Sequence, residues 1–148
     1  MIISPTSGAA IFLALTLVSW WFHRQTVVAR SYTEAEYRSL ASATTEPLWI
    51  QTLLSELAIP HCVPVVYCEN LSADNLCHNL ILHAKTKHIE LDIFFVREIA
   101  LAKQQIVKHV PGHEQWANIL TKPLSRTIFL FLSSKRIEVD LQVVSHPP

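Results

Sequence analysis

The chain has 148 residues, half of them apolar, and its twelve basic residues are balanced by twelve acidic ones. This length fits one domain with a single core, and this composition excludes a disordered chain. Because the net charge is zero, binding to nucleic acid cannot be argued from overall charge and requires a local basic patch.

The cysteines indicate the compartment. Cys62, Cys68 and Cys77 are odd in number and lack CxxC spacing. Such usage is typical of reduced thiols in an intracellular protein, cytoplasmic or nuclear and not secreted. A zinc site that includes His78 or His83 is the alternative.

The N-terminal part is rich in strand-forming residues and predicts a β-hairpin over residues 8–22. The apolar run is shorter than the roughly 20 residues of a membrane-spanning helix, and Thr16 and Ser19 interrupt it. We therefore expect no membrane partner, with membrane association through this run as the alternative. The turn near Ala14 lacks Gly, Asn and Asp, so the hairpin turn is poorly specified.

A long helix is predicted to follow. Thr33 is its expected N-cap, and Glu36 three residues later completes a capping box. Apolar residues continue on one face as far as Leu57. Pro47 lies inside this helix and removes a backbone donor, so we expect a kink or a break that costs about 3 kcal/mol.

Strands and helices alternate through the rest of the chain, which predicts an α/β domain with a mixed sheet. Residues 137–148 carry little signal and are expected to form a tail. The other expected elements are a buried strand over 63–68, a short helix over 71–79, a basic loop over 83–88, a helix from 89 to 100, a strand over 105–110, a helix over 114–121 and a C-terminal helix over about 125–136.

Three polar side chains fall at the edges of these elements. Glu36 lies in the first turn of a helix, Glu69 at the carboxyl end of a strand, and Asn118 within a late helix. Two-metal cleavage of a phosphodiester needs several oxygen ligands around two ions, and magnesium prefers carboxylates. The ordinary alternatives are a capping acid, a polar turn and a surface amide, respectively.

The loop with Lys85 and Lys87, flanked by His83 and His88, is the only local basic cluster that the sequence suggests. Its ordinary interpretation is a solvated loop, and contact with phosphate is the alternative.

Several segments carry a longer pattern in a fixed order. They are Thr6-Ser7-Gly8, Val18-Ser19-Trp20, Thr33-Glu34-Ala35-Glu36-Tyr37-Arg38, Val66-Tyr67-Cys68-Glu69-Asn70-Leu71-Ser72-Ala73, His83-Ala84-Lys85-Thr86-Lys87-His88-Ile89-Glu90, Phe95-Val96-Arg97-Glu98 and Ile119-Leu120-Thr121-Lys122-Pro123-Leu124. From residue 6 to about residue 135, this order resembles the ribonuclease H domain that closes the polyprotein of copia-type retrotransposons.

The resemblance implies a fold and an activity. It implies a ribonuclease H-like mixed sheet flanked by helices over residues 1–136, with the hairpin at 8–22 and an α/β core at 33–122. It implies magnesium-dependent cleavage of the RNA strand in RNA–DNA hybrids. The reverse transcriptase portion of the same polyprotein is the implied partner if a longer chain exists.

The resemblance also assigns residues. The family's acids match Glu36, Glu69 and Asn118. Contacts to the hybrid would fall on Thr33, Asn70, Ser72, Lys85 and Lys87.

Three departures from the family pattern reduce the expected chemistry. The first acid lies in a first strand that this chain lacks, the third is Glu69 where Asp is usual, and the fourth is Asn118 where Asp is usual. Glu36 and Glu69 are then the expected metal ligands, and we expect magnesium binding to be weak or lost and the nuclease to be impaired. The alternatives are a non-catalytic hybrid-binding remnant and a nuclease completed by a partner chain.

The missing first strand has a structural implication as well. In the family it lies in the middle of the sheet, between the hairpin and the parallel strands. We therefore expect a sheet without its central strand and a weakly anchored hairpin.

Overall fold

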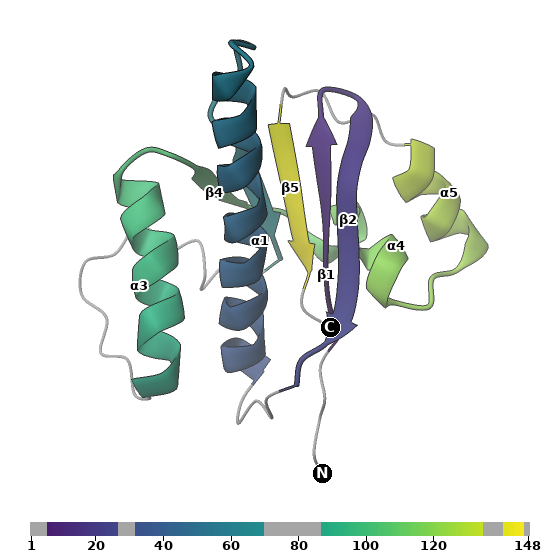
Figure 1. The fold of residues 1–148 in the computed structure, drawn as a ribbon. Helices are drawn as coiled ribbons and strands as arrows, with labels where there is room; N and C mark the ends of the chain where they lie inside the picture. Colours follow the sequence, from purple (N-terminus) through teal and green to yellow (C-terminus); the bar gives the residue numbers. More distant parts are fainter. Residues whose placement is uncertain (1–5, 27–31, 70–86, 135–140, 147–148) are drawn as a thin grey trace.

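The computed structural model describes residues 6–26, 32–69, 87–134 and 141–146 (Figure 1). Within these residues, five strands form one mixed sheet in the order β2-β1-β5-β3-β4. The strands are β1 (Thr6–Leu13), β2 (Thr16–Arg24), β3 (Val65–Cys68), β4 (Ile106–His109) and β5 (Leu141–His146). The helices are α1 (Tyr32–Glu56), α3 (Lys87–Leu101), the 3-10 turn η1 (Gly112–Glu114), α4 (Asn118–Thr121) and α5 (Arg126–Ser134).

The α/β class and the mixed sheet are confirmed. β1 pairs antiparallel with β2 and β5, whereas β3 pairs parallel with β4 and β5. The hairpin is confirmed too, and Ala14 makes its turn at a φ of 51°. A residue with a Cβ adopts this left-handed conformation at a cost of about 1–2 kcal/mol, which fits a turn with no glycine.

The expectation that residues 137–148 form only a tail is wrong for residues 141–146. These residues form β5, which lies between β1 and β3 and fills the central place that was expected to be empty (Figure 1). In register, Val143 lies opposite Ile11 of β1 on one side and Val66 of β3 on the other. Both neighbours are buried, so their backbone groups need partners, and a strand between them supplies these.

The expectation of a weakly anchored hairpin is also wrong. β1 pairs with β5 from Gly8 to Leu13, and Ala9, Ala10 and Ile11 have no exposed surface. The hairpin is therefore part of the core and holds its place through backbone pairing on both sides of β1.

α1 runs without a break through Pro47, so the expected split is wrong. A proline cannot donate to the helical ladder and pushes nearby carbonyls of the preceding turn outward. The carbonyl that loses its ladder donor at Pro47 is that of Ala43, four residues earlier. The neighbouring carbonyl of Thr44 accepts a hydrogen bond of 2.8 Å from Gln105 Nε2. Gln105 is buried and comes from the segment before β4, so a side chain distant in the sequence contacts the turn of α1 that contains Pro47.

The two faces of the sheet are covered differently. α1 and α3 lie side by side over one face, where the buried cluster forms (Figure 1). On the other face, Trp116 packs edge-on against Phe12 of β1, with ring centroids 5.0 Å apart. This contact places Trp116, in the segment that leads into α4, against the end of β1 near the hairpin turn. The core consists mainly of Ala9, Ile11, Tyr37, Leu40, Ala43, Ile50, Leu54, Val66, Cys68, Val96 and Val107.

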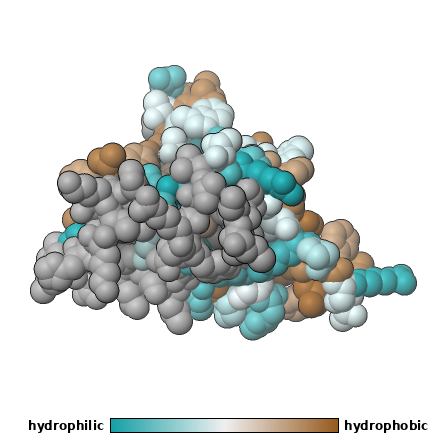
Figure 2. All heavy atoms as spheres, turned by 90° about the horizontal axis from the view of Figure 1, so that it is seen from below, coloured by the Kyte–Doolittle hydropathy of each residue, from teal (hydrophilic) through white to brown (hydrophobic). Residues whose placement is uncertain are grey.

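α5 keeps much of its apolar surface exposed. Figure 2 shows apolar side chains gathered at the side of the molecule where α5 lies. On this helix Leu132 is buried, while Ile128, Phe129, Leu130 and Phe131 are about half exposed. None of the described helices is long and apolar enough to cross a membrane.

Two expectations cannot be compared with the structure. The helix over 71–79 lies outside the described residues, as does most of the basic loop over 83–88. The helix expected over 114–121 is shorter than predicted, because η1 and a turn precede α4.

Candidate functional site

The candidate site lies at the end of the sheet where α1 begins and β3 ends (Figure 1). β1 starts at this end and β2 finishes there, since the two strands are antiparallel. Gln25, just after β2, joins these elements, because its Nε2 donates to Ser7 Oγ and to the carbonyl of Ala35, both at 2.8 Å. The start of the hairpin is thereby tied to the first turns of α1.

Glu69 and Asn118 are in direct contact. Asn118 Nδ2 donates to Glu69 Oε1 at 2.9 Å and to the carbonyl oxygen of Gly112 at 2.7 Å. Both partners are acceptors, so the amide must present its nitrogen to them. Asn118 is buried, and its Oδ1 has no hydrogen-bond partner within the described part of the chain.

Gly112 makes this contact possible. A Cβ at this position would lie 2.9 Å from Glu69 Oε1, closer than side chains tolerate. The Pro111-Gly112 turn therefore lets the carboxylate lie against the backbone of η1. Any larger residue would push Glu69 away from Asn118.

Lys122 supplies the charge that compensates Glu69. Its Nζ lies 3.6 Å from Glu69 Oε2, and the side chain of Glu69 is 15% exposed against 37% for Lys122. Lys122 directly follows α4, and its backbone N–H donates to the carbonyl of Asn118 at 3.0 Å. The amide and the ammonium that contact Glu69 therefore come from one short, continuous piece of backbone.

Glu36, the other predicted metal ligand, comes from α1. It is buried in the second turn of α1, because the helix begins at Tyr32, one residue before the predicted cap. Glu34, two residues earlier, is also buried and forms an ion pair with Arg38. Within the described residues, no three His, Cys, Asp or Glu side chains are arranged to hold a metal ion.

The residues present do not fit a magnesium ion as they stand. Magnesium requires near-octahedral oxygen coordination. Among the described residues, the Glu69 carboxylate has beside it the Asn118 amide, which turns its NH₂ toward the carboxylate, and the Lys122 ammonium. A hydrogen-bond donor and a cation in these positions do not bind a metal ion.

The predicted contacts to a nucleic acid cannot be placed. Asn70, Ser72 and Lys85 lie outside the described residues, and so do the side chains of Thr33 and Lys87. They remain predictions.

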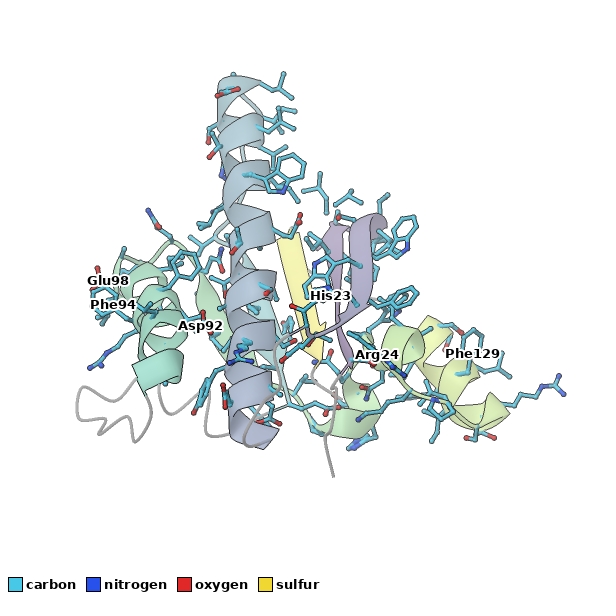
Figure 3. All side chains as sticks on the ribbon, turned by 60° about the horizontal axis from the view of Figure 1, so that its bottom comes forward. His23, Arg24, Asp92, Phe94, Glu98 and Phe129 are labelled. Carbon is cyan, nitrogen blue, oxygen red and sulfur yellow. The ribbon has the colours of Figure 1, made fainter. Side chains whose placement is uncertain are left out.

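A second charged group, not expected from the sequence, lies between α1 and α3. Figure 3 places Asp92 on the side of α3 that faces α1, whereas Phe94 and Glu98 lie on its outer side. Burial raises the pKa of Asp92; Arg38 lowers it, and Glu34 raises it further. Glu34 forms an ion pair with the Arg38 guanidinium, and Asp92 interacts electrostatically with both, so we assign this charged group to the packing of α3 against α1.

The sequence reasoning assigned no role to Lys122 or Gly112. Lys122 lies in the Ile119–Leu124 segment that carries the resemblance, and Gly112 follows the strand expected over 105–110, but the position of each beside Glu69 depends on the fold. A lysine four residues after a candidate ligand was the one available signal.

Comparison with known proteins gives close relatives over most of the chain. It is 44% identical over 131 residues to the retrovirus-related Pol polyprotein from transposon RE1 of Arabidopsis thaliana, covering 88% of this chain. It is 42% identical over 144 residues to that from transposon RE2 of the same plant, covering 97% of this chain. The corresponding polyprotein from transposon TNT 1-94 of Nicotiana tabacum is 36% identical over 112 residues, covering 76% of this chain.

These relatives are much longer than the chain. The aligned regions span 9%, 10% and 8% of the three polyproteins, respectively. No protein-family model matches the chain, and no solved structure matches it.

Proposed function

Because the chain belongs to the family of retrovirus-related Pol polyproteins of transposons, we propose that it is the ribonuclease H domain of a copia-type element and that it no longer cleaves RNA–DNA hybrids. In a longer polyprotein its partner would be the reverse transcriptase portion. The proposal has two parts, the domain type and the loss of activity, and different observations support them.

The contact between Glu69 and Asn118 supports the domain type. These residues are 49 positions apart, and the resemblance aligns both with acids of one metal site. A mixed sheet in which β3 lies between β5 and β4, with Glu69 directly after its carboxyl end, is compatible with the ribonuclease H-like arrangement. Polar side chains at the carboxyl ends of parallel strands are a common place for a site.

The nature of that same contact supports the loss of activity, and it is the observation that carries the proposal. Where the family has a second carboxylate, Asn118 donates a hydrogen bond to Glu69. Two carboxylates would repel each other and attract cations, whereas an amide and a carboxylate satisfy each other. Even residues one step removed from a metal typically change affinity or activity by about 10–100-fold, so replacing a ligand should cost at least as much.

A cleavage assay tests the loss of activity. The chain is incubated with an RNA–DNA hybrid labelled on the RNA strand, at high enzyme concentration, with Mg²⁺ or Mn²⁺. We expect no release of labelled fragments. Metal-dependent release that Glu36→Gln abolishes would show an active nuclease and refute this part of the proposal.

Hybrid binding without cleavage is tested separately, because it depends on other residues. Retention of the hybrid is measured over a series of salt concentrations, for the chain and for the double variant Lys85→Gln and Lys87→Gln. If both lysines contact phosphates, the slope of log K against log salt should fall in magnitude by about two. Equal slopes would exclude this loop as the binding surface.

A further inference from the structure

We infer that the Lys122 ammonium occupies the cation position beside Glu69, and that Lys122 and Asn118 together prevent Glu69 from binding divalent ions. This inference rests on the proposed function only in treating Asn118 as the place of a former acid. The contacts themselves supply the rest of the argument.

Both oxygens of Glu69 have a donor or cation beside them. Asn118 Nδ2 is 2.9 Å from Oε1, and Lys122 Nζ is 3.6 Å from Oε2. A carboxylate this buried is costly unless it is compensated. The lysine provides the compensating charge without the strict geometry that a magnesium ion would demand.

Asn118 cannot turn its oxygen toward a cation at this place. Both hydrogens of its amide are used, one by Glu69 Oε1 and one by the Gly112 carbonyl. A flip of the amide would break both hydrogen bonds and set Oδ1 against two acceptor oxygens. The buried Oδ1 therefore stays without a partner within the described residues while the nitrogen is engaged.

Of the two side chains that contact Glu69, Lys122 is the one whose place a divalent ion can take. Its side chain is partly exposed and, among the described residues, forms an ion pair with Glu69 alone, whereas Asn118 is buried. Removal of the ammonium should take away the positive charge that now lies 3.6 Å from Glu69 Oε2. A divalent ion can then take its place, most readily if Asn118 again becomes an acid.

The test uses the full chain in four forms: unaltered, Asn118→Asp, Lys122→Met and the double variant. Mn²⁺ binding is measured by calorimetry without nucleic acid, and the thermal midpoint is measured with and without Mn²⁺. We expect the unaltered chain to show no response to Mn²⁺. We expect the double variant to bind at least about tenfold more tightly, the lower bound for restoring a group at a metal site.

Two controls identify the residues responsible. Glu69→Gln added to the double variant should abolish the gained binding. Lys103→Met removes an equal charge from an exposed position in the turn after α3 and should leave Mn²⁺ binding unchanged. Circular dichroism shows whether each variant folds.

Lys122→Met alone keeps the inference testable if the double variant does not fold. Its thermal midpoint should be lower than that of the unaltered chain, and Mn²⁺ should restore part of the loss. A midpoint that neither falls nor responds to Mn²⁺ would overturn the inference, as would tight Mn²⁺ binding by the unaltered chain through Glu69. Hybrid cleavage is not measured in this experiment, so the inference and the proposed function can fail independently.

Discussion

Gly8 of β1 lies against Thr121 at the end of α4, so Gly8→Ala should destabilise the protein. A Cβ at Gly8 would lie 2.6 Å from Thr121 Cγ2 and 3.3 Å from the carbonyl oxygen of Trp21. Carbon atoms pack best at about 3.5–4.0 Å, so roughly 1 Å of overlap must be relieved. Overpacking of this kind typically costs about 1–3 kcal/mol.

Thr121→Ser removes the methyl group that clashes and should rescue most of this loss. Rescue should be incomplete, because the close approach to the Trp21 carbonyl remains. Urea unfolding of the unaltered chain, Gly8→Ala, Thr121→Ser and the double variant gives the coupling energy between the two positions. We expect it within the range of about 0.5–3 kcal/mol that contacting residues show.

A coupling energy near zero would refute this reasoning. Gly8→Ala would then cost the same with Thr121 or Ser at position 121, and α4 could not pack against the start of β1. Because α4 begins at Asn118, the placement of the candidate site would lose its support as well.

Three other changes test separate parts of the fold by thermal or urea unfolding. Val143→Pro should cost at least about 1–3 kcal/mol because it removes a backbone donor from the central strand, whereas Val143→Ala keeps the donor and should cost less; equal effects would contradict the pairing of β5. Asp92→Asn should raise the thermal midpoint near pH 7 and change it little near pH 3. Burial raises the folded-state pKa of the Asp92 carboxyl above its ordinary 3.8, so the stability that this carboxyl contributes at low pH is lost as the pH rises through the raised pKa. Gln105→Ala should cost about 1–3 kcal/mol because it removes the buried hydrogen bond to the Thr44 carbonyl. Gln51→Ala, which removes an exposed hydrogen bond to the Gln104 carbonyl, should change stability by less than about 0.5 kcal/mol, and similar values for both would exclude a special role for Gln105.

The elements with strong local patterns could be predicted from the sequence. The hairpin, α1, β3, α3 and β4 all lie close to their expected ranges, because apolar periodicity and β-branched runs report burial directly. The contact of Glu69 with Asn118 could also be anticipated, but through the resemblance and not through spacing. No local pattern connects two residues that are 49 positions apart.

The rest depends on partners that local patterns do not reveal. Residues 141–146 form a strand because two buried strands flank them, and their own sequence gives little sign of it. Pro47 interrupts a helix on any local rule, yet Gln105 supports the affected turn from a distant segment. Lys122 acquires its role only when the end of α4 reaches Glu69.

The pairing of Gly8 with His146 joins the two ends of the sequence in one ladder. Folding rates fall as contacts become more distant along the chain, because a large loop must close before the contact contributes stability. We therefore expect slow folding, in which the hairpin and the β3–β4 pair form early and are joined only when β5 pairs with both. Until residues 141–146 arrive, β1 and β3 each present an open edge, and this interval is when chains are most prone to aggregate.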